Sequence, residues 1–161
     1  MRYLGVVAIL ISVTSCVSYQ PLPEGYTGPT AMIIDTMDPI SSTRAGFFQI
    51  TAVDGRDVLS SSNSTQAASS GQGFMMSQRT ESRLVPSGKV TLSLEGRISV
   101  AAPILALTGG MYSIKGEVDV ELESEMAYYV RGFLSNDYTT VWLEDNKGNV
   151  VSEKLEQGTR R

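Results

Sequence analysis

The chain contains no histidine, the commonest general base near neutral pH and the commonest metal ligand in proteins. A Ser-His-Asp or Cys-His site cannot be built without it, and zinc lacks its usual nitrogen ligand. No G-x-S-x-G, G-x-G-x-x-G or P-loop pattern is present either. Two-acid glycoside hydrolysis stays open, because it needs only paired Asp or Glu. We therefore expect a protein that is not an enzyme and that binds no metal ion and no cofactor.

Cysteine occurs only once, as Cys16, so a disulfide within the chain is excluded and the fold must be stabilised by packing. Cys16 follows Arg2, an apolar run over residues 3–13 and the small residue Ser15, which is the order of parts in a secretory signal. The run is shorter than the roughly 20 residues that span a bilayer. It indicates export rather than a transmembrane anchor.

The run Val13-Thr14-Ser15-Cys16 resembles the lipobox of bacterial lipoproteins. This resemblance implies a signal peptide over residues 1–15, cleavage before Cys16 and diacylglycerol on the Cys16 sulfur, and several acyl chains at one residue give stable anchoring. By the same resemblance, Val17 in place of an aspartate implies export to the outer membrane, with the domain in the periplasm. An ordinary secretory signal, cleaved at the same place, is the alternative.

Positive charge is in the minority, with 13 Lys and Arg against 17 Asp and Glu and a formal net charge of -4. Overall charge of this sign attracts neither a nucleic acid backbone nor an anionic lipid surface. We expect no nucleic acid partner. The expected partners are the membrane, through the lipid at Cys16, and another envelope protein.

The chain divides by composition into four parts. Residues 16–30 contain Pro21, Pro23 and Pro29 with two glycines, which is typical of an extended tether. Residues 31–157 form a single expected domain, and 158–161 a short tail. Within the domain the serine-rich run 60–70 is predicted to be a mobile loop, because little in it offsets the cost of ordering.

Alternation of apolar and polar residues predicts several short strands separated by turn residues. The clearest run lies at 90–95, and further strands are predicted at 31–34, 46–53, 117–125, 127–134, 139–144 and 150–155. Residues 100–107 are apolar throughout and are predicted to form a buried connection or edge strand, the alternative being a loop that dips into a membrane or contacts a partner. With no convincing helix, the pattern favours an all-β antiparallel β-sandwich, with a small barrel as the alternative.

Two groups of side chains are candidate sites. Carboxylates recur at every second position of one predicted strand, namely Glu117, Asp119, Glu121, Glu123 and Glu125. Such a row is either a solvated outer face that discourages edge pairing or a face for cations or a basic partner. Aromatic residues form the second group: Trp142 beside Tyr138, with Tyr128, is a candidate ligand platform, although a single tryptophan in a small β domain also serves as core.

Val53-Asp54-Gly55, the segment 84–92, Ala127-Tyr128-Tyr129-Val130 and the segment 141–145 together resemble a group of bacterial lipoproteins with an immunoglobulin- or transthyretin-like domain. The resemblance departs from the group's pattern at Ser87 and at 100–107, and it implies a fold and an anchored placement but no substrate. We expect a non-catalytic interaction or structural module, accessory to an envelope complex. A module that binds a small ligand or glycan is the alternative, and a carboxylate-dependent hydrolase is a third hypothesis.

Overall fold

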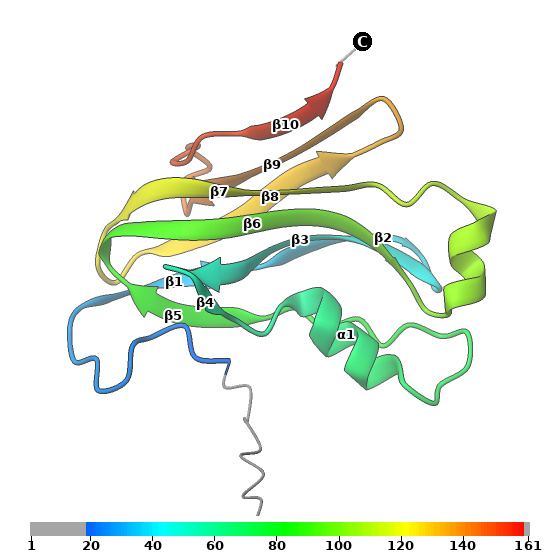
Figure 1. Cartoon of the computed structure of the whole chain (residues 1–161), viewed down its shortest axis with the longest axis horizontal. Coiled ribbons are helices and arrows are strands. Elements are labelled where there is room, and N and C mark those ends of the chain that lie inside the picture. Colours follow the sequence, from blue (N-terminus) through cyan, green and yellow to red (C-terminus); the bar gives the residue numbers. More distant parts are fainter. Residues whose placement is uncertain (1–18, 160–161) are drawn as a thin grey trace, which may run out of the picture.

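The computed structural model describes residues 19–159, so the expected leader and Cys16 lie outside the described residues. Two sheets pack face to face in an all-β sandwich, as the sequence predicted, and they do not close into a barrel (Figure 1). The first sheet has the strand order β10-β9-β8-β1-β5. The second has the order β2-β3-β6-β7, and β4 pairs with β3.

The strands of the first sheet are β1 (Thr30–Ile34), β5 (Ser82–Pro86), β8 (Ala127–Leu134), β9 (Tyr138–Asp145) and β10 (Leu155–Gly158). Those of the second sheet are β2 (Thr36–Ser41), β3 (Arg44–Val53), β4 (Arg56–Asp57), β6 (Gly88–Val100) and β7 (Ser113–Leu122). Within residues 19–159 the strands pair antiparallel, except that β1 and β8 run parallel with Ile33 opposite Tyr128. The chain makes this parallel pair because it crosses between the sheets before β8 returns to β1.

The core between the sheets is built from the inward positions of alternating strands. Leu92 and Leu94 of β6 face Val130 of β8 and Leu143 of β9 in one apolar cluster, and all four are fully buried. Burying an aliphatic side chain of this size contributes about 1.5–3 kcal/mol. The alternation of apolar and polar residues in these strands therefore supplies the apolar core that holds the two sheets together.

The serine-rich segment is a helix, α1 (Ser61–Ser69), and the prediction of a mobile loop was wrong. It is held by hydrogen bonds rather than by an apolar face. Gln49 on β3 is fully buried, donates to the Ser62 hydroxyl at 2.8 Å and accepts from the Ser62 amide at 2.8 Å. The Thr65 hydroxyl accepts from the Arg79 amide at 2.8 Å. Partners that lie far away in the sequence thus offset the cost of ordering a polar segment.

The apolar segment 100–107 is also different from the principal prediction. Strand β6 ends at Val100, and a 3-10 helix, η1 (Pro103–Thr108), follows. The side chains of Ile104 and Leu107 are exposed. The segment is neither a buried connection nor an edge strand, since Pro103 at its start removes a backbone donor and favours a turn.

Three further features differ from the expectation. The first is the Asp38-Pro39 pair, which in the sequence is typical of a turn. Pro39 lies inside β2, which is an edge strand where a missing amide is tolerated. After the turn at Asp145, residues 150–154 form only an isolated bridge at Val150, and the returning strand β10 begins at Leu155. At the start of the domain the carbonyl of Pro29 accepts hydrogen bonds from the amide and hydroxyl of Ser87, so part of the expected tether lies against the sandwich.

Candidate functional site

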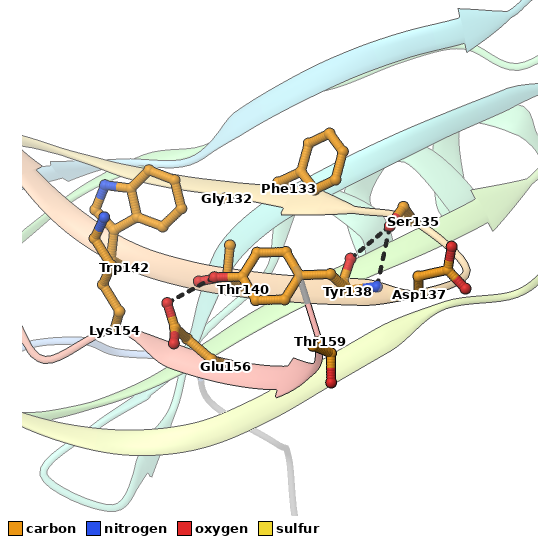
Figure 2. Close-up of a pocket in the computed structure, with 10 residues that line it drawn as sticks. All are labelled: Gly132, Phe133, Ser135, Asp137, Tyr138, Thr140, Trp142, Lys154, Glu156 and Thr159. Carbon is orange, nitrogen blue, oxygen red and sulfur yellow. Dashed lines mark hydrogen bonds between the residues drawn. The ribbon is translucent and has the colours of Figure 1, made fainter. Parts of the chain in front are cut away.

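A groove of about 520 Å³ crosses the outer face of the first sheet where β8, β9 and β10 lie side by side (Figure 2). Its lining comes from these strands and from the turns beside them: Gly132, Phe133, Ser135, Asp137, Tyr138, Thr140, Trp142, Lys154, Glu156 and Thr159. Trp142 and Tyr138, which the sequence analysis paired as a platform, both line it.

Strand register explains why these side chains meet. On β9, Tyr138, Thr140 and Trp142 are separated by two residues each and therefore share the outer face of the sheet. Phe133 of β8 and Glu156 of β10 lie directly opposite Thr140 on its two sides. Four side chains from three strands thus surround Thr140, which lies between the two aromatic ends of the groove (Figure 2).

Aromatic rings form the walls at both ends. The rings of Phe133 and Tyr138 lie with their centroids 6.5 Å apart and tilted by 35°. At the other end the ammonium of Lys154 lies 4.5 Å from the centroid of the Trp142 ring, which is a cation-π contact. The indole Nε1 of Trp142 donates to Glu144 at 2.7 Å, so the ring has a fixed orientation.

Polar groups are fixed between these walls. The Tyr138 hydroxyl donates to the carboxylate of Glu156 at 2.6 Å, and the Ser135 hydroxyl accepts from the Tyr138 amide at 3.1 Å. Thr140 is only 3% exposed, and its hydroxyl has no hydrogen-bond partner among residues 19–159. Native proteins rarely leave a buried hydroxyl without a partner. The Thr140 hydroxyl is therefore an unsatisfied polar group in the lining of the groove.

This arrangement suits a small ligand with both apolar and hydroxyl surfaces. Aromatic faces accept carbon-bound hydrogens, and hydroxyl, carboxylate and ammonium groups form hydrogen bonds with a ligand's hydroxyls. Few polar groups among aromatic walls are characteristic of small-molecule sites.

The third expected residue, Tyr128, does not belong to this platform. Its side chain is 3% exposed and lies in the apolar core, because position 128 of β8 faces inward. Its hydroxyl accepts a hydrogen bond from the amide of Glu123 at 2.8 Å. Tyr128 therefore fixes the turn between β7 and β8. The aromatic residue that β8 contributes to the groove is Phe133.

The row of carboxylates is divided by the end of a strand. Glu117, Asp119 and Glu121 lie exposed on β7, whereas Glu123 and Glu125 follow its last residue, Leu122, in the turn. Glu125 has a φ of 62°, a left-handed conformation. Asp119 accepts from the Thr91 hydroxyl at 2.7 Å. Within residues 19–159 no group of three or more acidic, histidine or cysteine side chains is placed to hold a metal ion.

Sequence reasoning identified Tyr138 and Trp142 but not the other eight residues of the lining, among them Phe133, Thr140, Lys154 and Glu156. The alternation of 139–144 places Thr140 on the same face as Trp142, and this signal was available in the sequence. The position of Glu156 was not available, because it depends on the register of β10, whose first residue, Leu155, is the last residue of the predicted strand 150–155.

Helices long and apolar enough to cross a membrane are absent from the part of the chain that the structure describes. Comparison with protein-family profiles found no match, and searches of the curated proteins and of the solved structures found none either.

Proposed function

We propose that this chain is a lipid-anchored protein of the bacterial outer membrane that binds a glycan without chemically changing it. The anchor is supported by the run Val13-Thr14-Ser15-Cys16 after a short apolar segment. Acylation at Cys16 keeps the domain at the periplasmic face of the membrane. There a small binding domain meets envelope glycans at high local concentration.

The side chains of the groove around Thr140 indicate the class of ligand. The buried hydroxyl of Thr140, which has no partner in the part of the chain that the structure describes, lies between Tyr138 and Trp142. A sugar ring offers an apolar face for an aromatic wall and hydroxyls for Thr140, Glu156 and Lys154. No other single observation in residues 19–159 combines these properties.

The absence of histidine supports a binding role. Glu156 already accepts a hydrogen bond from Tyr138, which suits a carboxylate that orients hydroxyls. A hydrolase would need a second carboxylate in the groove, and Asp137 is the candidate. Replacing Asp137 by Asn therefore separates the two: it abolishes turnover in a hydrolase and leaves a binding module bound to its glycan.

The experiment is a titration of the detergent-solubilised full chain with soluble peptidoglycan fragments and with lipopolysaccharide core oligosaccharides, followed by Trp142 emission. We expect saturable change with one of them. Tyr138→Phe, which loses the hydrogen bond to Glu156, weakens binding, whereas Tyr19→Phe, outside the groove, leaves binding unchanged. An emission spectrum that no envelope glycan alters, with the protein folded, contradicts the glycan proposal.

A second candidate is contact with another envelope protein, and one observation favours it. Met32 of β1 and Leu84 of β5 are opposite each other on the outer face of the first sheet, and both are exposed. Adjacent exposed apolar side chains on the outer face of a sheet suit contact with another protein. Purification of the wild type and Cys16→Ala chains in mild detergent, with mass spectrometry of the bait and its partners, tests this. A stoichiometric partner that Met32→Glu removes supports it, and a bait recovered alone contradicts it.

A further inference from the structure

Three loops meet at one end of the sandwich. The amide of Ala101 donates to the carbonyl of Thr43 at 2.8 Å, and the amide of Met76 donates to the carbonyl of Ser42 at 3.1 Å. These bonds join the turn between β2 and β3, the loop that follows α1, and the segment that contains η1. In Figure 1 the last two lie at the same end of the molecule. We call residues 40–43, 70–76 and 101–111 together the loop end.

Large apolar side chains protrude from all three parts of the loop end. Leu107 is 81% exposed and Phe74 is 60% exposed. The exposed group comprises Ile40, Phe74, Met75, Ile104, Leu107 and Met111. They stand on separate loop tips and so make a projecting surface. An exposed apolar surface of this kind is suited to entering a soft apolar phase. A groove of about 610 Å³ lies beside it, but small and polar side chains from α1 and the segments 70–76 and 97–102 form most of its lining, which does not suit the apolar face of a helix.

Charge is distributed unevenly between this end and the rest of the chain. The segments 39–44, 58–80 and 96–112 contain no Asp or Glu, and their charged residues are Arg44, Arg79 and Arg97. The net charge of the whole chain is nevertheless -4. The loop end itself thus contains no charged residue. The flanking residues Arg44 and Arg79 attract phosphate groups, whereas Arg97 is paired with Glu95 at 3.6 Å.

Only a short length of chain separates Cys16, the expected site of the lipid, from the first described residue that is hydrogen-bonded to the domain. The side chain of Arg56 donates to the carbonyl of Pro21 at 3.3 Å, which fixes the chain five residues after Cys16. Five extended residues span at most about 18 Å. The blue segment that begins at residue 19 runs along the same long side of the molecule as α1 in Figure 1. An acylated chain therefore has this side near the bilayer, and the loop after α1 lies on it.

We propose that the loop end is a second membrane contact, whose apolar tips enter the interface of an anionic phospholipid bilayer. The inference rests on the proposed acylation of Cys16, which supplies the nearby bilayer. Leu107, Ile104 and Phe74 bury their side chains among the upper acyl chains, and the flanking Arg44 and Arg79 bind lipid phosphates. One acyl-bearing residue alone leaves the domain free to rotate, and this contact fixes the face that it turns to the membrane.

The test places an indole at the tip and asks whether it meets acyl chains. Leu107→Trp and the control Val150→Trp are made in the full chain and reconstituted in vesicles of phosphatidylethanolamine and phosphatidylglycerol, with or without brominated acyl chains. Val150 is also exposed, but it lies in the connection between β9 and β10. Trp142 is present in every sample, and the wild type gives its contribution. Phe74→Trp repeats the test on another loop, and circular dichroism verifies the fold of each variant.

We expect a blue shift and loss of emission by bromine for Leu107→Trp and Phe74→Trp, and neither for Val150→Trp. Intact mass of the same samples reports acylation of Cys16. An acylated chain without the shift overturns the membrane contact and leaves the anchor standing. A shift in a chain without acyl mass supports the contact and overturns the anchor. Equal quenching at 107 and 150 also overturns the contact, because it means that no face is preferred.

Discussion

Arg83 and Asp35 form an ion pair that is almost completely buried, with Arg83 Nη2 2.7 Å from Asp35 Oδ2. Asp35 is the single residue between β1 and β2. Its carboxylate also accepts hydrogen bonds from the amide and hydroxyl of Ser61 and from the amide of Ile50. Burial raises the pKa of Asp35, and Arg83, Ser61 and Ile50 act in the opposite direction. One carboxylate thus joins both sheets to the first turn of α1.

Arg83→Met is expected to destabilise the fold strongly, because it leaves the Asp35 carboxylate buried without its counter-ion. Breaking a buried pair from one side costs about 3–5 kcal/mol. Urea unfolding followed by Trp142 emission measures the change. Arg131→Met is the matched control: Arg131 pairs with Glu144 at 3.7 Å on the surface, and an exposed pair contributes less than about 1 kcal/mol. Equal losses for the two variants would contradict a special role for Asp35.

The double variant Asp35→Asn with Arg83→Met separates charge from hydrogen bonding. It removes both charges and keeps a side chain that can accept from Ser61. We expect it to recover part of the stability lost in Arg83→Met, since removing both members of a buried pair is far less costly than removing one. A double variant no more stable than Arg83→Met would place the loss in packing around the arginine.

The sheet alternation is the part of the fold that the sequence predicted well. Strand β8 has the predicted bounds, and the apolar core positions of β6 and β9 follow from period two, because alternate side chains of a strand point to the same face of the sheet. The helix α1 was not predictable in this way. Its ordering depends on Asp35 and Gln49, which lie far from it in sequence, and polar segments carry no local signal of a distant partner.

Part of the candidate site could likewise be predicted from the sequence, and part could not. Tyr138 and Trp142 share a strand face, so their proximity follows from spacing alone. Tyr128 was expected with them, although the alternation of 127–134 puts it on the same apolar face as Val130 and Leu134. The structure turns this face of β8 toward the core. The loop end depends on three connections that meet only in the folded chain, so the sequence showed its apolar runs without their proximity.

Gly132→Ala is expected to destabilise the sandwich, because a β-carbon there meets the ring of Phe48 and the carbonyl of Thr140, both at 2.4 Å. Overpacking of this kind costs about 1–3 kcal/mol. Thermal unfolding measures it. Gly46→Ala is the control in the opposite sheet, since its β-carbon meets nothing closer than 3.4 Å. Equal stability of Gly132→Ala and Gly46→Ala would contradict the close approach of β8 to Phe48.

Asp145 is expected to give the β9–β10 connection a pH-dependent stability. Hydrogen bonds from the side chain and amide of Asn149, with that from the Lys147 amide, lower the pKa of Asp145 below its ordinary value of 3.8. A carboxyl with a lowered folded-state pKa stabilises the fold above the unfolded pKa, and this contribution is lost as the pH falls through the folded value.

The wild type should therefore be more stable than Asp145→Ala at pH 7, and the difference should disappear as the pH falls below about 3.8 and passes the lowered folded-state pKa. Thermal unfolding of both proteins over this range measures the difference. Asp137→Ala, in the turn between β8 and β9, is the control for loss of an acidic turn residue. A difference that stays constant down to the lowest pH would assign the effect to backbone conformation.

Thr140→Val is expected to make the protein more stable and, if the groove binds a glycan, a poorer binder. The Thr140 hydroxyl is buried and has no partner within residues 19–159, and a buried polar group in this state costs about 1–3 kcal/mol that a methyl group avoids. We expect a gain of about 1 kcal/mol in urea unfolding. Glycan affinity falls because the hydroxyl satisfied by the ligand is gone.

Thr139→Val is the control that separates the two effects. The Thr139 hydroxyl is also buried without a partner among the described residues, but Thr139 lies outside the groove lining. It should therefore gain stability as Thr140→Val does and keep the wild-type response of Trp142 to the glycan. Because both variants delete the same group from neighbouring positions of β9, a shared loss of binding would indicate a general change in the sheet. A loss at Thr140 alone would locate the ligand at that hydroxyl.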